Sequence, residues 1–299
     1  MVLAGALFGI MGVFTKVLAK DLDHALVVFF RAFVNLLFVL AFLLPAGLSV
    51  FRSSPWERRI LITRGTMGFI SLYCYFFAIE YIPFSLAVVL GASAPFFVRV
   101  LDAVWNRLRG RTPKKNSWSY VFLGFIGLAM VVKLDPRAFD THWTGRYSWG
   151  VVMGTLAGFF AACSYLSIER VASRVPNDLI VFYFALIATV GSAPLALPQL
   201  NWQAPQFGLS ALTMLRLLAM GLAGALGQKS MTSAYRFAPA SFVSFMALMT
   251  PVFGVAGGVV FLDERFDALQ CWGAAVVAVA LAGTLGVLRK FSLPRRTSS

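Results

Sequence analysis

Residues 78–95 read AIEYIPFSLAVVLGASAP, and residues 234–251 read AYRFAPASFVSFMALMTP. The second stretch repeats residues of the first at one offset of 156 positions (239 − 83). The matched pairs are Ala78 and Ala234, Pro83 and Pro239, Ser85 and Ser241, Pro95 and Pro251, and, further along, Gly127 and Gly283. Identical residues at a fixed offset in an apolar chain indicate an internal duplication.

The prolines of each stretch predict a helix with a break inside it. Pro83 and Pro239 suit the first turn of a helix, where the missing N–H is not needed. Pro95 and Pro251 follow twelve residues later (95 − 83). That is roughly 18 Å along a helix, near the middle of a hydrocarbon core of roughly 30 Å. We predict kinks at Pro95 and Pro251 that help to shape a central cavity; kinks with only a structural role are the alternative.

The composition is that of an integral membrane protein. Hydrophobic residues make up 59% of the 299 residues and charged residues 13%, with a mean hydropathy of +0.79. Soluble domains carry about 25% charged residues. The net charge of +14 would suit nucleic acid, but the basic residues gather in loops on one side, as orientation in a membrane requires. We therefore expect a lipid bilayer as the partner, and no nucleic acid.

Ten apolar segments are long enough, or nearly so, to span a bilayer. They cover residues 2–18, 25–44, 60–79, 82–104, 118–132, 149–168, 179–197, 215–235, 240–262 and 268–288. The fold class predicted is all-α and polytopic, with one five-helix repeat over 1–134 and another over 148–290. Because five is odd, the second repeat enters the membrane from the opposite side, which makes an inverted repeat.

The basic residues of the loops predict the orientation. With the N-terminus in the cytoplasm, fifteen Lys and Arg residues lie in cytoplasmic loops and the C-terminal tail, against six on the other side. This excess places both termini in the cytoplasm. No basic n-region precedes the first segment, so no cleavable signal peptide is predicted. Small residues four apart, such as Gly5 and Gly9, favour close helix packing and leave a homodimer open.

Five basic residues fall inside apolar segments: Lys16, Arg31, Arg64, Arg99 and Lys229. The first three lie near segment ends, where a long side chain reaches the interface, and Arg99 can pair with Asp102. Lys229 lies deep in its segment and falls on Tyr73 at the offset of 156. We predict that Lys229 faces the cavity, where it would bind a carboxylate or phosphate. A lysine satisfied by carbonyls at a nearby kink is the alternative.

Signatures of enzymes are missing from the sequence. The histidines are His24 and His142, both in predicted loops, and no glycine-rich phosphate loop is followed by lysine. The cysteines, Cys74, Cys163 and Cys271, lie in apolar segments and suit packing rather than a metal site. We expect no catalytic residues, no metal and no cofactor.

The ordered set of features resembles the EamA-like family of the drug/metabolite transporter superfamily. The features are two halves of five segments, a proline-started helix with a second proline inside it, Arg31-Ala32-Phe33, Arg64-Gly65 and Leu262-Asp263-Glu264-Arg265. The resemblance implies a carrier of the bacterial inner membrane whose central cavity is lined by the first, third, fourth, sixth, eighth and ninth segments. Carried over to this chain, it nominates Tyr73, Phe77, Ser93, Tyr165, Gln228, Lys229, Ser244 and Met249 as substrate-binding residues.

The function predicted is secondary transport of a small metabolite by alternating access, with export of amino acids or related compounds as the first hypothesis. The alternative is uptake or exchange of a larger anionic metabolite, such as a nucleotide or an adenosyl compound. An isolated buried cation at Lys229 would favour this alternative. An intramembrane enzyme or a scaffold is the third hypothesis.

Overall fold

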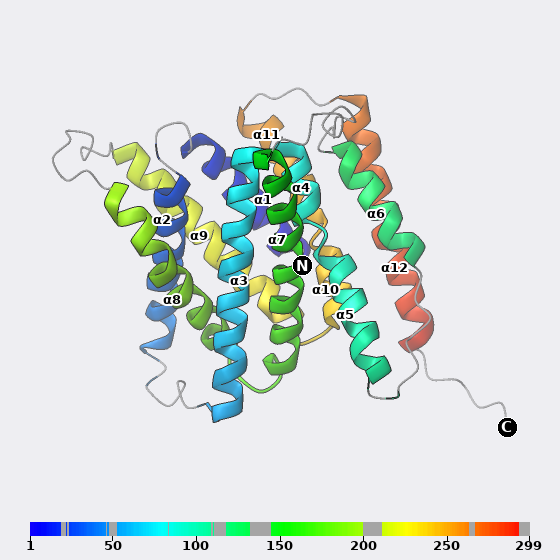
Figure 1. Ribbon diagram of the computed structural model, residues 1–299, viewed down its shortest axis with the longest axis horizontal. Coiled ribbons are helices and arrows are strands. Elements are labelled where there is room, and N and C mark those ends of the chain that lie inside the picture. The colour runs from blue at the N-terminus through cyan, green and yellow to red at the C-terminus, as the bar shows by residue number, and fades with distance from the viewer. Residues whose placement is uncertain are drawn as a thin grey trace.

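A computed structural model gives the structure of the chain as a bundle of helices (Figure 1). It describes every residue except 19–21, 23, 46, 48–52, 83, 109, 111–117, 132–144, 200–210, 263–266 and 293–299. Pro83 and Asp263–Arg265 of the motifs above thus lie outside the described residues, as does His142. The helices are α1 (Val2–Leu18), α2 (His24–Leu43), α3 (Pro55–Tyr81), α4 (Phe84–Gly91), α5 (Ala94–Leu108), α6 (Trp118–Val131), α7 (Gly145–Val171), α8 (Asn177–Ala196), the short 3₁₀ helix η3 (Leu197–Gln199), α9 (Ala211–Ala234), α10 (Ala240–Met246), α11 (Met249–Leu262) and α12 (Ala268–Ser292).

Helix occupies each of the apolar segments of the sequence. Among the described residues, five stretches are long and apolar enough to cross a membrane: Ala25–Leu43, Pro55–Ala78, Gly145–Val171, Asn177–Ala196 and Ala211–Ala234. Shorter apolar helices cover Val2–Thr15, Ser119–Met130, Ala240–Gly254 and Ala268–Ala280. The prediction of an all-α membrane protein is confirmed over the described residues.

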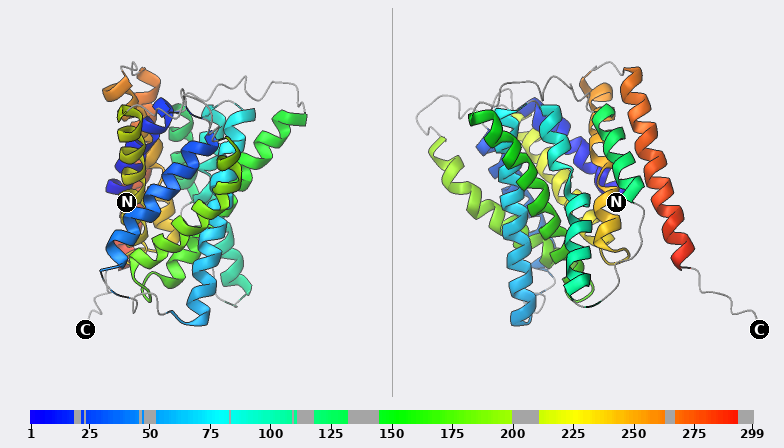
Figure 2. Two further views of the ribbon diagram at one scale, coloured as in Figure 1. Left: turned by 90° about the vertical axis from the view of Figure 1, so that its left-hand side faces the viewer. Right: turned by 45° about the vertical axis from the view of Figure 1, so that its right-hand side comes forward.

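The helices pack in pairs that mirror one another between the two halves of the chain. α3 packs along α7, and α1 packs along α9. α3 also contacts α8, and α9 contacts α2. α2 lies against α8 at one end of the molecule, and α6 lies against α12 at the other (Figures 1 and 2). Exchanging the two halves of the chain turns the contact of α3 with α7 into that of α9 with α1, and the contact of α3 with α8 into that of α9 with α2. The contacts of α2 with α8 and of α6 with α12 stay the same.

Glycines set the contact between α6 and α12. A Cβ added to Gly127 would lie 2.8 Å from the backbone nitrogen of Val277 and 2.9 Å from the carbonyl oxygen of Gly273. A Cβ added to Gly283 would lie 2.7 Å from Cδ1 of Tyr120. The two glycines matched at the offset of 156 therefore each face the opposite helix, which allows close approach.

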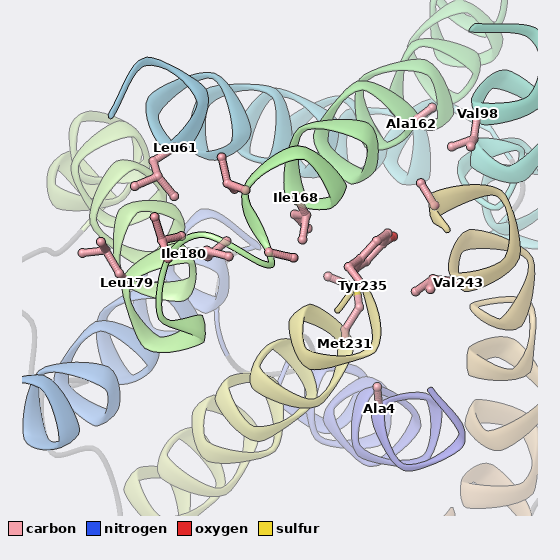
Figure 3. Packing of buried hydrophobic residues seen from close by; sticks show 14 residues of the cluster. Ala4, Leu61, Val98, Ala162, Ile168, Leu179, Ile180, Met231, Tyr235 and Val243 are labelled. Atoms are coloured by element: carbon pink, nitrogen blue, oxygen red, sulfur yellow. The ribbon is translucent and has the colours of Figure 1, made fainter. Parts of the chain in front are cut away.

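The largest core cluster lies where α7 and α9 approach each other. It joins buried side chains of seven helices, among them Ala4, Leu61, Val98, Ile168, Ile180, Met231 and Val243 (Figure 3). Tyr235, which directly follows α9, projects into the same cluster toward α7 (Figure 3). This packing holds the ends of α7, α9 and α10 together.

Two helices are interrupted at matching places. α4 ends at Gly91 and α5 begins at Ala94, with Pro95 as its second residue. α10 ends at Met246 and α11 begins at Met249, with Pro251 as its third residue. A proline has no N–H for the carbonyl four residues back, at Gly91 and Ala247 respectively, so each gap falls where that bond is missing.

The two interruptions meet in one apolar cluster. Phe245, Met246 and Leu248 of the second interruption are buried together with residues of α6 and α12. Ala92 of the first interruption packs against this cluster. Within the gaps the backbone tightens: Ser93 N donates to the Leu90 carbonyl, and Leu248 N to the Phe245 carbonyl, both at 3.1 Å.

Candidate functional site

Arg64 lies in the interior because α3 begins earlier than its apolar stretch. Ser54 caps the helix: its hydroxyl accepts from Glu57 N, and the Glu57 carboxylate accepts from Ser54 N. This capping box, with Pro55 in the first turn, fixes the start of the helix on the water side. Arg64 is nine residues (64 − 55) into α3, roughly 14 Å along its axis.

The guanidinium of Arg64 contacts side chains of two other helices, α8 and α9, and a side chain of a third, α7, bonds to the backbone of Arg64. Its side chain is among the largest that are fully buried, with 2% of the residue exposed. Nη2 donates to Oε1 of Gln228 on α9 at 3.2 Å, and the guanidinium carbon lies 4.4 Å from the ring centre of Phe184 on α8. Ser164 of α7 donates to the Arg64 carbonyl at 3.4 Å.

The expectation that Arg64 reaches the interface is wrong. α3 begins at Pro55, five residues before residue 60, where hydropathy placed the start of the segment (60 − 55). The Arg64 side chain therefore does not reach the end of the helix. Gly68, one turn further, makes room for the guanidinium, because a Cβ there would overlap Nη1 of Arg64. Arg64 is thus a buried cation, and its Nε has no hydrogen-bond partner among the described residues.

Two tyrosines complete the surroundings of Arg64. The rings of Tyr165 on α7 and Tyr235 are 5.9 Å apart. Both are close enough to the guanidinium to interact with it electrostatically. The hydroxyl of Tyr235 is buried and has no hydrogen-bond partner within the described part of the chain. Of the predicted site residues, Tyr165 and Gln228 therefore gather around Arg64, which was not nominated.

Lys229 is not the isolated cation that the sequence suggested. Its Nζ lies 2.8 Å from Oδ1 of Asp178 in the first turn of α8, and 4.5 Å from the ring centre of Phe42. The side chains of Lys229 and Asp178 are 34% and 29% exposed. Beside them, Asn177 donates to the hydroxyl of Ser233. A carboxylate partner, not kink carbonyls, satisfies Lys229.

Three other predicted site residues lie at the helix interruptions. Ser93 donates from its hydroxyl to the Leu90 carbonyl at 2.5 Å, inside the first gap. Gly158 of α7 faces it closely, since a Cβ there would lie 2.9 Å from the same carbonyl. Ser244 is fully buried before the second gap, and Met249 follows that gap at the cluster shared with α6 and α12.

The two predicted residues on α3 lie apart from Arg64. Tyr73 is 45% exposed, with its ring 6.2 Å from that of Phe69. The ring of Phe77 lies 4.6 Å from that of Tyr81. Tyr73 follows Arg64 by nine residues, roughly 14 Å along the helix. The predicted residues thus divide into an interior group, a group at the interruptions and a group on α3.

The chemistry available in the interior is anion binding. A buried guanidinium offers several N–H donors in a planar fork that matches a carboxylate. Within the described residues, no three His, Cys, Asp or Glu side chains come together as metal ligands would. The buried side chains around Arg64 can bind a negatively charged group. They do not form a set of metal ligands within the described residues.

Comparisons with known proteins identify the family of the chain. The model of the EamA-like transporter family matches residues 1–133 and 148–286. The pseudopaline exporter CntI of Pseudomonas aeruginosa is 32% identical over 281 residues, covering 93% of this chain and 92% of the relative. A riboflavin transporter of Vibrio cholerae is 27% identical, covering 74% of this chain and 69% of the relative.

A human protein matches in sequence, and a solved structure matches in fold. Human solute carrier family 35 member G1 is 26% identical, over 93% of this chain and 75% of that protein. A solved crystal structure aligns with a TM-score of 0.73 at 16% identity, covering 97% of this chain and 99% of that chain. The chain belongs to the EamA-like transporter family of the drug/metabolite transporter superfamily, as a multi-pass protein of the inner membrane and not an enzyme.

Proposed function

We propose that the chain is a secondary transporter that exports amino acids or related small compounds by alternating access. The observation that carries the proposal is the pair of helix interruptions, Gly91–Ala94 and Met246–Met249, at equivalent places in the two halves. Interrupted helices at the interface of two repeats are where transporters of this kind bind substrate. One relative, the pseudopaline exporter, supports export as the direction of transport.

The proposal includes two inverted repeats of five spans, over residues 1–134 and 148–290, with both termini in the cytoplasm. The mirrored packing of α3 on α7 and of α1 on α9 supports it. So does the contact of α6 with α12, in which each helix presents its matched glycine to the other. Such reciprocal contacts are what a two-fold relation between repeats produces.

The substrate would bind between the interior group and the interruptions. Tyr165 and Gln228 would contribute from the interior, and Ser93, Ser244 and Met249 from the interruptions. Tyr73 and Phe77 stay predictions for the same cavity. Lys229 was predicted for it as well, but its ion pair with Asp178 favours a structural role. The alternative of a larger anionic substrate rested on Lys229 as a free cation, and the ion pair with Asp178 removes that support.

Counterflow in proteoliposomes tests the proposal. Vesicles with purified protein are loaded with single unlabelled amino acids, and uptake of the matching labelled compound is followed without an ion gradient. We expect transient accumulation of at least one amino acid above protein-free vesicles. A nucleotide or adenosyl compound that accumulates while every amino acid fails would overturn the assignment of substrate class. A repeat with an imposed pH gradient identifies obligatory proton coupling.

A further inference from the structure

We infer that Arg64, together with Thr232 and Tyr235, forms the subsite that takes the carboxylate of the transported compound. The inference rests on the proposed transport function and names the group of the substrate that the interior recognises. It assigns a binding role to three residues that the sequence had not nominated.

The geometry places the three residues on facing surfaces. Gln228 and Thr232 are one turn apart on α9, so their side chains lie on the same face. Tyr235 follows three residues later, in a turn whose N–H bonds back to the Thr232 carbonyl at 3.3 Å. Because Gln228 accepts from Arg64, this face of α9 is turned toward α3. Tyr235 follows on from this face, and it too lies close enough to the Arg64 guanidinium to interact with it electrostatically.

Three buried polar atoms on these surfaces have no hydrogen-bond partner among the described residues. They are Nε of Arg64, Oγ1 of Thr232 and the hydroxyl of Tyr235. All three residues are buried, Thr232 completely. Buried polar groups in native proteins are nearly always bonded, so unbonded ones need an explanation. Each of the three groups can donate a hydrogen bond, and none of them has an acceptor among the described residues.

A carboxylate supplies what is missing. Its two oxygens accept several hydrogen bonds, including the paired ones of a guanidinium. Its single negative charge also balances the single charge of Arg64, which no carboxylate of the described part of the chain pairs with. A phosphate would bring more negative charge than this one cation balances. An organic cation would be repelled by it.

The surroundings favour a substrate that carries an apolar side chain close to its carboxylate. Phe184 covers one side of the guanidinium, and Tyr165 packs beside Tyr235. These rings offer apolar surface close to the charged group. An amino acid with an apolar or aromatic side chain combines both properties.

The test compares acids with their amides. Counterflow is measured for leucine and phenylalanine, and for leucinamide and phenylalaninamide, in wild type, Arg64→Gln and Arg58→Gln. Arg58 is an exposed arginine on the same helix and serves as the control. We expect wild type to exchange the acids at least tenfold better than the amides. Arg64→Gln should lose at least tenfold of the acid exchange, and Arg58→Gln should stay within twofold of wild type.

Two conservative variants guard against a simple loss of folding. Tyr235→Phe and Thr232→Val each remove a hydroxyl that has no partner in the described structure and keep the shape of the side chain. Removing an unsatisfied buried group should leave thermal stability equal or higher. If the hydroxyls bind the carboxylate, the half-saturating acid concentration rises severalfold in both variants. Unchanged half-saturation in both would overturn the inference, even where Arg64→Gln does not fold.

The failures of the inference and of the proposed function can be told apart. Equal exchange of acids and amides by wild type would refute the carboxylate subsite and leave amino-acid transport standing. Full acid exchange by a folded Arg64→Gln would do the same. Exchange of neither acids nor amides by folded wild type, with or without a pH gradient, would refute the proposed function and the subsite with it.

Discussion

The ion pair between Lys229 and Asp178 can be tested against substrate binding by Lys229. The sequence predicted that Lys229 binds the substrate, whereas the ion pair indicates a structural role. The perturbation is a cycle of Lys229→Gln, Asp178→Asn and the double variant. In the structure the pair joins α9 to α8 at 2.8 Å, and the ammonium also lies 4.5 Å from the Phe42 ring centre on α2. If the pair is structural, each single substitution lowers the free energy of unfolding, and adding the second substitution lowers it little further.

The magnitude follows from the distance and the exposure. Two unit charges at the observed 2.8 Å would attract by about 6 kcal/mol at an effective dielectric constant of about 20. Both side chains are about one-third exposed, so solvent and the lost side-chain entropy remove most of this, as in exposed pairs worth about 0.2–1 kcal/mol. We expect a coupling free energy of about 1 kcal/mol. The contact with Phe42 adds about 0.5–1 kcal/mol to the cost of Lys229→Gln alone.

The assay combines thermal unfolding in detergent with counterflow. A cost of 1 kcal/mol should lower Tm by roughly 1.5–2 °C in a chain of 299 residues. The Tm of the double variant should fall by less than the sum of the decreases in the two single variants. Half-saturating concentrations for the exported amino acid should stay within about twofold of wild type, since the pair is outside the Arg64 cluster. A Lys229→Gln protein that loses counterflow at unchanged Tm, while Asp178→Asn transports normally, would refute the structural role of the pair. Lys229 would then bind substrate, as the sequence predicted.

Two further predictions concern the packing and the start of a helix. Gly9→Ala would place a Cβ 2.8 Å from the backbone carbon of Phe253 on α11, so it should cost about 1–3 kcal/mol. Gly12→Ala on the same helix meets nothing within 4 Å and should leave Tm equal or raise it, which makes it the matched control. Ser54→Ala should cost about 1 kcal/mol by removing the cap of α3, and Glu57→Gln, which keeps an acceptor for Ser54 N, should cost less. Thermal unfolding measures all four; a Gly9→Ala protein as stable as Gly12→Ala would contradict the contact of α1 with α11.

The sequence predicted the helices well because their length and apolar content are set by the bilayer. It also located the interruptions, since a proline beyond the first turn of a helix removes one defined hydrogen bond. Neither inference needs knowledge of tertiary contacts. The pairing of α3 with α7 does need it, and no local pattern in the sequence indicated it.

The sequence ranked the burial of Arg64 and Lys229 in the wrong order, for two physical reasons. Arg64 was judged by its distance from the end of an apolar segment, but the helix begins at the polar Ser54-Pro55-Trp56-Glu57 stretch. This capping signature was visible in the sequence and would have moved the helix start outward. Lys229 was judged deep, yet its partner Asp178 is far away in sequence and becomes its neighbour only when α8 and α9 pack together.

The internal duplication gives the sharpest test of whether the polar cluster serves the fold. At the offset of 156, Arg64 falls on Met220 and Gln228 falls on Leu72. Met220 is fully buried, so one half of the chain fills the place of the arginine with an apolar side chain. The repeat framework therefore does not itself require the charge.

The double variant Arg64→Met and Gln228→Leu copies the residues of the other half. Replacing both members of a buried polar contact by apolar groups is often neutral or stabilising, whereas breaking one member is not. We expect a Tm equal to or above that of wild type, a lower Tm for Gln228→Leu alone, and acid counterflow no higher than in protein-free vesicles. A double variant that unfolds well below wild type would mean that the cluster holds α3 to α9. Stability kept with transport lost would mean that a buried charge is retained here for the compound that crosses the membrane.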